Sequence, residues 1–401
     1  MDLQDHFSTM TRQPGSTALA ELFKLTERPD IISFAGGFPA PEMFLPEEAA
    51  EVTRQLMVEE PFTVLGYSPT PGFSALREFL AARQLSLGMP AAASEIMVTS
   101  GSLQGLDILG RVFLNRGDRI IIEAPNYLGA LRTFAAFDVK LDAIPIDTEG
   151  LNTTRLAALL EQRRHQDSLP KLLYTVPTFQ NPSGQTMSLQ RRQELLALAD
   201  RYGFLIIEDN AYGELRFAGE AVPTLKALDS GEKVIYLGTF SKILAPGIRI
   251  GWIHAATEII ERAILVRQGM DQCSNSFGQL LTLEFGRRGL IKKQIDKTAC
   301  LLGERARLTI DLLAREFPKG TTWTKPEGGF YTWVTLSPEI DTAKLLAHCI
   351  EKAQVAYVAG VAFYAGGEGG SNQLRLCYSQ PSLTDIARGI PRLAKALTAP
   401  F

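Results

Sequence analysis

The sequence predicts an α/β protein in which a large domain with a mostly parallel sheet is followed by a smaller α+β domain. Short apolar runs alternate with helical patterns from about residue 70 to about residue 290, which is typical of parallel strands connected by helices. A helical stretch rich in Lys and Arg follows, and strand-like patterns return beyond it. A chain of 401 residues is long enough for two such domains.

The expected division of the chain follows from these changes of pattern. We expect a large domain that ends near residue 290, at 46–290, and a small domain at 291–401. Within the small domain the strand-like stretches are 328–334, 355–358 and 374–378. The glycine-rich run at 365–370 predicts a flexible loop.

The first segment of interest joins an apolar strand, 96–99, to a helix that begins near Ser102. Apolar residues recur three apart from Leu103 onward, which indicates the helix. Backbone N–H groups and a serine hydroxyl at a helix N-terminus form a ready phosphate site. The segment matches neither the GxGxxG nor the P-loop pattern, so alone it is a weak signal.

A second segment of interest is a short apolar strand that begins at Lys171 and ends in a turn that contains Asn181-Pro182. A residue before proline is held extended, so the Asn181 amide is expected to be a rigid hydrogen-bond donor. Taken alone, an ordinary Asn-Pro turn that binds nothing explains this segment better.

A helix and a buried strand then lead to Asp209. Ser188 is the expected N-cap of a helix that Gly203 ends, and an apolar strand occupies 204–207. Asp209 follows that strand, where ligands bind in open α/β sheets. A buried carboxylate there can pair with the protonated pyridine nitrogen of a cofactor ring, and Tyr212 can reach a phenolic oxygen on the same ring. The alternative is a metal or salt-bridge site at Glu208-Asp209.

Lys242 lies in the run at 234–252, just after a β-branched strand and the hydroxyls of Thr239 and Ser241. Arg249 follows seven residues later. A lysine beside hydroxyls and an arginine suits a Schiff base with an aldehyde cofactor whose phosphate these groups hold. The alternative is a solvated surface lysine.

Composition excludes several classes of protein. A net charge of −3 without a basic run argues against nucleic-acid binding. No apolar stretch reaches the ~20 residues of a membrane span, and the first 30 residues lack a signal-peptide pattern. The four cysteines are far apart, which indicates reduced thiols in a cytoplasmic protein, and the four histidines form no metal set. We therefore expect no metal.

Together these segments resemble the fold-type I aminotransferases of class I/II, which use pyridoxal 5′-phosphate (PLP), and especially the 2-aminoadipate and kynurenine aminotransferase branch. The resemblance covers most of the chain and implies the aspartate aminotransferase-like fold, with residues 1–45 packed on the small domain. The matching motifs are Ser33-Phe-Ala-Gly-Gly-Phe-Pro39, Gly66-Tyr-Ser68, Thr99-Ser-Gly-Ser102, Ala124-Pro-Asn-Tyr127, Asn181-Pro-Ser-Gly184, Glu208-Asp209 with Tyr212, Ser241-Lys242, Pro246-Gly-Ile-Arg249 and Leu374-Arg375-Leu376.

The resemblance also implies a role for each matching residue. Catalysis falls to Lys242, which forms the Schiff base and moves the proton, with Asp209 at the pyridine nitrogen and Tyr212 at the phenolic oxygen. The resemblance further implies that Asn181 contacts the phenolic oxygen and that Tyr127 stacks on the ring. The implied phosphate contacts are Ser102, the Leu103 backbone N–H, Thr239, Ser241 and Arg249, with Tyr67 reaching the phosphate of the neighbouring subunit. Arg375, with the Gly37 backbone and Asn181, is implied to bind the substrate.

Two positions depart from the branch. Leu103 stands where glutamine is common, which removes a side-chain donor. Ala20 stands where members that use acidic substrates tend to have arginine, although Arg12 or Arg28 could substitute. The sequence therefore leaves open whether an acidic side chain is recognised, and also the L or D handedness of the donor.

We expect an aminotransferase that moves an amino group from an amino acid to a 2-oxo acid, with 2-oxoglutarate or pyruvate as acceptor. The resemblance implies ping-pong kinetics and a homodimer with shared active sites. A PLP-dependent lyase or decarboxylase on the same fold is the alternative. A PLP-binding regulator is less favoured, because barely 30 residues precede Ser33, too few for a DNA-binding helix-turn-helix.

Overall fold

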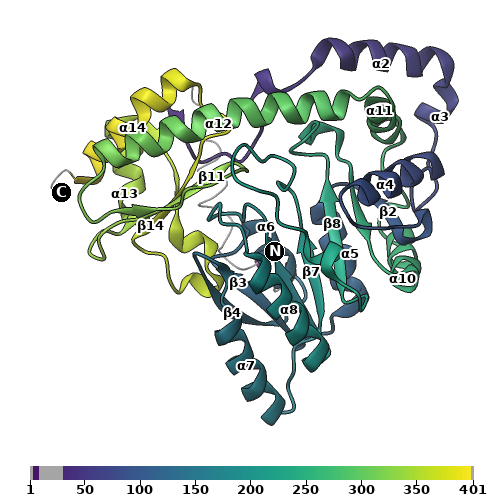
Figure 1. The fold of residues 1–401 in the computed structure, drawn as a ribbon, viewed down its shortest axis with the longest axis horizontal. Coiled ribbons are helices and arrows are strands. Elements are labelled where there is room, and N and C mark those ends of the chain that lie inside the picture. Colours follow the sequence, from purple (N-terminus) through teal and green to yellow (C-terminus); the bar gives the residue numbers. More distant parts are fainter. Residues whose placement is uncertain (1–2, 9–29, 399–401) are drawn as a thin grey trace.

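The computed structural model describes residues 3–8 and 30–398, and Figure 1 shows a large sheet domain beside a smaller one. The large sheet has eight strands in the order β2-β9-β8-β7-β6-β3-β4-β5. Their bounds are β2 Ile96–Thr99, β3 Arg119–Ala124, β4 Lys140–Asp147, β5 Gly150–Leu151, β6 Leu172–Thr175, β7 Leu205–Asp209, β8 Val234–Thr239 and β9 Gly251–His254. Strands β4, β3, β6, β7 and β8 are parallel, whereas β9 is antiparallel to both β8 and β2.

Helices cover both faces of this sheet, because its strands are apolar on both sides. On β3, Ile120 and Ile122 face one cluster and Ile121 faces the other. The first cluster includes residues of α5 (Ser102–Phe113), α6 (Leu128–Ala135) and α10 (Thr257–Gln268). The second includes residues of α7 (Thr153–His165), α8 (Leu189–Tyr202) and α9 (Leu225–Leu228).

The ends of α8 match the expectation from sequence. Ser188 is the N-cap and its side chain accepts a hydrogen bond from the backbone N–H of Arg191. Gly203 ends the helix in the left-handed conformation at φ +74°. The chain then enters β7, which is longer than the expected strand at 204–207, so Asp209 is the last residue of the strand rather than a residue just past its end.

The smaller domain is built on a four-stranded antiparallel sheet in the order β10-β11-β14-β13. These strands are β10 Thr322–Trp323, β11 Tyr331–Thr335, β13 Val358–Ala359 and β14 Gln373–Cys377. Helices α12 (Leu290–Glu316), α13 (Thr342–His348) and α14 (Leu383–Thr398) belong to this part, and α12 runs from the end of α11 (Ser276–Arg287) to α14 (Figure 1).

One expectation for the small domain is wrong in detail. The stretch at 355–358 is not one strand: β12 (Val355–Ala356) pairs with β1 (Ile32–Ser33), and β13 belongs to the four-stranded sheet. The glycine-rich run at 365–370 lies in the connection between β13 and β14, with a three-residue 3₁₀ turn at Ala365–Gly367, and its flexibility stays a prediction. The pairing of β1 with β12 places residues 32–33 on the small domain.

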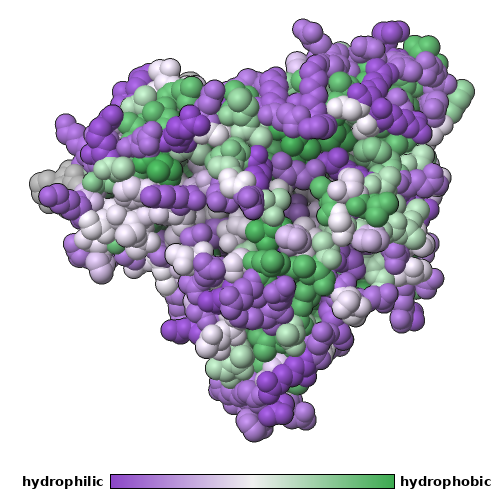
Figure 2. Space-filling view, viewed as in Figure 1, coloured by the Kyte–Doolittle hydropathy of each residue, from purple (hydrophilic) through white to green (hydrophobic). Residues whose placement is uncertain are grey.

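Apolar side chains are exposed where the first helices lie. Helix α2 (Pro46–Glu59) leads into α3 (Pro61–Leu65), which lies near α4 (Ser74–Ser86) at the end of the molecule in Figure 1. The exposed fractions are 92% for Phe62, 74% for Leu65 and 88% for Tyr67. Figure 2 shows apolar residues in green among polar ones at this end.

Candidate active site

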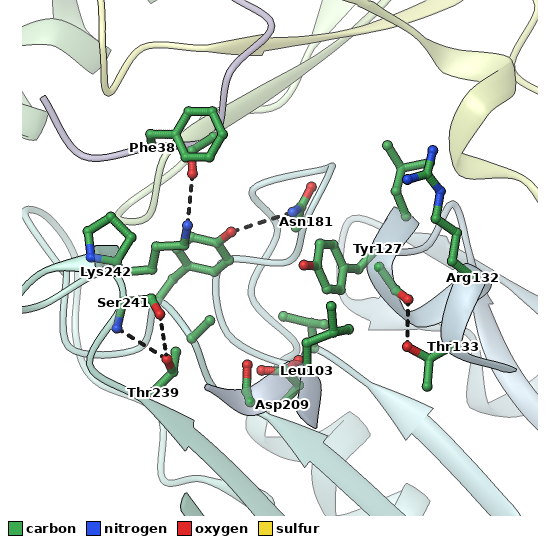
Figure 3. Close-up of a pocket in the computed structure, with 18 of the residues that line it drawn as sticks. Phe38, Leu103, Tyr127, Arg132, Thr133, Asn181, Asp209, Thr239, Ser241 and Lys242 are labelled. Atoms are coloured by element: carbon green, nitrogen blue, oxygen red, sulfur yellow. Dashed lines mark hydrogen bonds between the residues drawn. The ribbon is translucent and has the colours of Figure 1, made fainter. Parts of the chain in front are cut away.

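A cavity of about 610 Å³ opens at the carboxyl ends of β7 and β8 and reaches β11 and β14 of the small domain (Figure 3). Ligand sites are expected at this edge of an open α/β sheet. Every predicted site residue except Tyr67 lines it: Gly37, Ser102, Leu103, Tyr127, Asn181, Asp209, Tyr212, Thr239, Ser241, Lys242, Arg249 and Arg375. Tyr67 does not line it and is exposed elsewhere on the subunit.

Lys242 is brought into the cavity by the turn that follows β8. Its Nζ donates a hydrogen bond to the carbonyl oxygen of Gly37 at 2.8 Å, and the rings of Phe38 and Phe330 lie 5.9 and 5.8 Å away. Burial lowers the pKa of Lys242 to about 8, and Arg375 and Arg249 contribute to this lowering through their charge. The amine is therefore partly neutral near neutral pH, as a nucleophile must be.

Asp209 presents one carboxylate oxygen that has no partner. Its Oδ2 accepts a hydrogen bond from Tyr174 Oη at 2.9 Å, and its Oδ1 is buried without a hydrogen bond among the described residues. Burial raises the pKa of Asp209 to about 6, although the Tyr174 hydroxyl opposes this rise. A buried oxygen without a donor is costly, so the site fits a ligand that brings an N–H group to Asp209.

Hydroxyls and an arginine form a pocket for an anion at the start of α5. Thr239 Oγ1 donates to Ser241 Oγ at 3.0 Å, and Arg249 Nη1 donates to the same oxygen at 3.3 Å. Gly101, at φ +90°, precedes Ser102, and a Cβ on this glycine would collide with the Arg249 guanidinium. The glycine therefore lets Arg249 reach the positive end of the helix, where a phosphate is stabilised.

Asn181 links two further groups in the cavity. Its Nδ2 donates to Tyr212 Oη at 3.4 Å, and its Oδ1 accepts from Arg375 Nη1 at 2.9 Å. Arg375 Nη2 also donates to the carbonyl oxygen of Ala35 at 2.6 Å. The Asn181–Pro182 peptide is cis. The amide is thus held from both ends, as a rigid donor requires.

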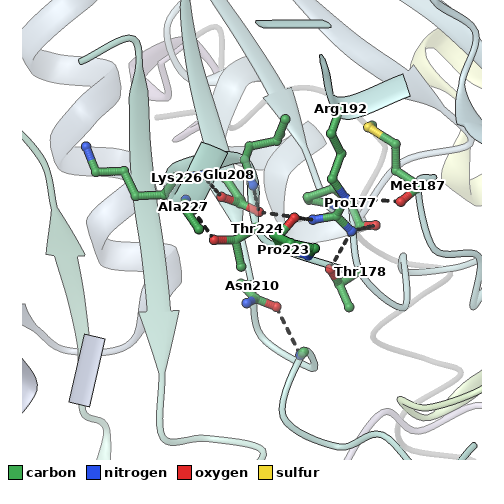
Figure 4. Close-up of polar contacts among 12 residues, drawn as sticks. Pro177, Thr178, Met187, Arg192, Glu208, Asn210, Pro223, Thr224, Lys226 and Ala227 are labelled. Carbon is green, nitrogen blue, oxygen red and sulfur yellow. Dashed lines mark hydrogen bonds and ion pairs between the residues drawn. The ribbon is translucent and has the colours of Figure 1, made fainter. Parts of the chain in front are cut away.

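Arg192 and Glu208 belong to a buried charged cluster, which Figure 4 shows. Arg192 on α8 donates to the carbonyl oxygens of Pro177, Met187 and Pro223 at 2.9 to 3.1 Å, and its guanidinium lies 3.8 Å from Glu208 Oε1. Both Arg192 and Glu208 are fully buried. The cluster joins the turn that carries Asn181 to the strand that carries Asp209.

Sequence reasoning missed several residues of this site. Tyr174 and Tyr331 make direct hydrogen bonds to Asp209 and Tyr212, and Phe38 and Arg132 line the cavity. Tyr174 pairs with Ile207 on the neighbouring strand, so it shares a face with Asp209 two residues further on. Side-chain alternation along the two strands was an available signal, but using it required the register.

The fold and the site together define a PLP enzyme of the aspartate aminotransferase-like fold, type I. The family model of aminotransferase class I and II matches residues 29–393, and the chain belongs to this family. It is 42% identical over 398 residues to aromatic-amino-acid aminotransferase 1 of Thermococcus litoralis, covering 99% of this chain and 95% of that protein.

Two solved structures have the same fold. Kynurenine aminotransferase of Pyrococcus horikoshii, in complex with PMP, is 41% identical and has a TM-score of 0.95 over 99% of this chain and 98% of that chain. The α-aminoadipate aminotransferase of Thermus thermophilus, complexed with N-(5′-phosphopyridoxyl)-L-leucine, is 34% identical with a TM-score of 0.91 over 99% and 98%. The expected family, fold, cofactor and reaction are confirmed, and the lyase or decarboxylase alternative is not favoured.

The described residues offer neither a metal cluster nor a membrane-spanning helix. Among residues 3–8 and 30–398, no cluster of three or more His, Cys, Asp or Glu residues could hold a metal ion. In the same part of the chain, no helix combines the length and apolar character needed to span a membrane.

Ala20, Arg12 and Arg28, the positions considered for recognition of an acidic substrate, lie outside the described residues.

Proposed function

We propose that the cavity holds PLP between Lys242 and Asp209. The observation that carries this proposal is the unpartnered Oδ1 of Asp209, in the described part of the chain, in the same cavity as a buried lysine whose pKa is lowered. The cofactor supplies an electron sink for charge that develops at the substrate Cα. The residues proposed to hold it are Asp209 at the ring nitrogen, Asn181 and Tyr212 at the phenolic oxygen, Tyr127 at the ring face, and Ser102, the Leu103 N–H, Thr239, Ser241 and Arg249 at the phosphate.

Two residues of the chain, Arg375 and Lys242, act directly on the substrate. Arg375 binds the α-carboxylate, because its guanidinium is buried beside the cavity and matches a carboxylate in a bidentate way. Lys242 Nζ, as a neutral amine, takes the proton from the substrate Cα, holds it, and would deliver it to the bound cofactor. The Gly37 carbonyl keeps that amine in place, at 2.8 Å from Nζ.

We propose amino acids with aromatic side chains as donors, 2-oxoglutarate or pyruvate as acceptor, and ping-pong kinetics. Two relatives bear the names of aromatic and kynurenine aminotransferases. In this chain, the exposed side chains of Phe38 and Leu103 line the cavity and offer apolar surface to such a side chain.

Borohydride reduction and a donor panel test the proposal. Reduction of the holoenzyme followed by peptide mapping should label Lys242, and label on another lysine would contradict the assignment. A panel of L- and D-amino acids should then be mixed with the holoenzyme, and loss of its visible absorption band should be fastest with aromatic donors. If acidic donors are faster, the substrate class is wrong while the reaction stands.

We also propose a homodimer in which Tyr67 completes the site of the partner subunit. Tyr67 follows α3, where Phe62 and Leu65 are also exposed, and apolar surface of this kind marks an interface. The test mixes an inactive Lys242→Ala chain with a Tyr67→Phe chain and lets subunits exchange. One site of the heterodimer has both residues, so activity per intact lysine should exceed that of the Tyr67→Phe homodimer. No increase in an exchanged mixture would place Tyr67 outside the partner's site.

A cytoplasmic location is proposed from the cysteines. Cys273, Cys300, Cys349 and Cys377 are all free thiols, as expected in a reducing compartment. Cell fractionation tests this location, and recovery in an exported fraction would contradict it.

A further inference from the structure

Tyr331 is a buried residue of the cavity to which the proposed function gives no role. It is the first residue of β11 and is 2% exposed. It pairs with Cys377 on β14, so Arg375, two residues away on the same strand, lies diagonally opposite on the same face of the sheet. The small domain thus places Tyr331 and Arg375 side by side at the cavity wall.

The hydroxyl of Tyr331 contacts the hydroxyl of Tyr212. The two Oη atoms are 3.1 Å apart, and Tyr212 Oη also accepts from Asn181 Nδ2 at 3.4 Å. A phenol has a single proton to donate. If Tyr212 donates that proton to the phenolic oxygen of the cofactor, the hydrogen bond between the two tyrosines must be donated by Tyr331.

The ring of Tyr331 also contacts Arg375. The guanidinium carbon of Arg375 lies 4.3 Å from the ring centroid, which is close cation–π geometry in a buried setting. Arg375 Nη1 in turn donates to Asn181 Oδ1 at 2.9 Å. Contacts therefore run in a closed circuit from Arg375 through Asn181 and Tyr212 to Tyr331 and back to Arg375.

A glycine leaves room for this arrangement. A Cβ placed on Gly37 would collide with Tyr331 Oη, so any larger residue would displace the hydroxyl. The carbonyl of the same glycine accepts the hydrogen bond of Lys242 Nζ. The Tyr331 hydroxyl thus sits beside the segment that holds the lysine.

We propose that Tyr331 is a positioning residue with two separable parts: its hydroxyl holds Tyr212 as a donor to the phenolic oxygen of PLP, and its ring holds Arg375 for the substrate carboxylate. This inference rests on the proposed function of the cavity. Hydrogen bonds in a chain strengthen one another, so donation from Tyr331 makes Tyr212 a better donor. With the cofactor bound, such a donor would withdraw charge from the phenolic oxygen, and a nitrogen shared by Lys242 and the cofactor would hold its proton less tightly.

Two substitutions separate the two parts. Tyr331→Phe removes the hydroxyl and keeps the ring, so the pH midpoint at which the visible band of the bound cofactor changes should rise by about half a unit. The KM values for donor and acceptor should stay within about twofold in this variant, because Arg375 keeps its cation–π contact. Tyr331→Leu also removes the ring, and both KM values should rise about 5- to 30-fold.

Tyr357→Phe is the matched control. Tyr357 is also a fully buried tyrosine of the small domain, and its hydroxyl donates to the carbonyl oxygen of Thr342 at 2.6 Å, away from the cavity. It should lower the melting temperature without moving the spectral midpoint. All variants are compared as holoenzymes with their circular dichroism checked.

The outcomes distinguish this inference from the function on which it rests. If the wild-type protein shows no titrating cofactor band and no transamination, the proposed function fails and the inference fails with it. If the wild type is active, an unchanged midpoint in folded Tyr331→Phe overturns the role of the hydroxyl. Unchanged KM values in Tyr331→Leu, or a rise for only one of the two substrates, overturn the role of the ring.

Discussion

As the pH is lowered, cofactor binding weakens when Asp209 becomes protonated. Replacing Tyr174 with phenylalanine should make this weakening begin at a higher pH than in the wild type. Tyr174 Oη donates to Asp209 Oδ2 at 2.9 Å, and the pKa of Asp209 is about 6 because burial raises it. The hydrogen bond favours the ionised carboxylate, so its loss raises the pKa of Asp209 further. The ionised form is the one that pairs with a protonated ring nitrogen.

The magnitude follows from the strength of one buried hydrogen bond to a charged group. Such a bond contributes about 1.5–3 kcal/mol, which corresponds to a rise of about 1–2 pKa units. Starting from a pKa of about 6, the fraction of ionised Asp209 falls ~5- to 50-fold at about pH 6 and ~2- to 10-fold at about pH 7. Near pH 8.5 the two proteins should differ less than ~1.5-fold.

The assay is a titration of each apoprotein with PLP, followed by absorbance, at several pH values. The ratio of the two dissociation constants removes the pH dependence that both proteins share through Lys242. Tyr202→Phe is the control. The Tyr202 hydroxyl also donates to a carboxylate, that of Glu161, and neither residue lines the cavity. A ratio that is constant with pH, or largest at high pH, would refute the reasoning.

Three further predictions concern single residues. Arg375→Lys keeps the charge but loses the bidentate fork, so KM for donor and acceptor should both rise at least about tenfold; an effect on the donor alone would make Arg375 a side-chain selector. Asp209→Ala should lower turnover by more than about 10²-fold and Asp209→Glu by much less, whereas near-normal turnover of the alanine variant would mean that another group holds the ring nitrogen. Arg192→Met leaves Glu208 as a buried charge without a cation, so the free energy of unfolding in denaturant should fall by about 3–5 kcal/mol. A fall below ~1 kcal/mol would mean that the backbone N–H groups of residues 225 and 226 are enough to stabilise the Glu208 carboxylate.

Much of the large domain could be predicted because its signals are local. The N-cap at Ser188 and the stop at Gly203 depend on neighbours within four residues, and the structure contains both. The apolar runs at 204–207 and 234–237, which a parallel sheet must bury, indicated these two strands, although both extend two residues further, to Asp209 and Thr239. The polar residues that follow these runs were therefore the natural candidates for a site.

The small domain was predicted less well because its pairing is not local. Residues 355–358 read as one apolar strand, yet the chain divides there between the partner β1 and the partner β14. Nothing in four consecutive residues indicates two partners that lie about 320 residues before and about 16 residues after them. A short strand takes its identity from its neighbours in the sheet rather than from its own residues.

By itself, the sequence indicated the chemistry of the protein, because Lys242, Asp209 and Arg249 stand at or just after predicted strands, and because their motifs and that of Arg375 resemble those of one enzyme family. Only the tertiary structure decided which atoms meet: that Tyr174 covers one oxygen of Asp209 and leaves the other without a partner among the described residues, and that Tyr331 joins Arg375 to Tyr212. The physical reason is that sheet register and domain packing set these contacts. Register depends on how whole strands align, which no single segment of the chain specifies.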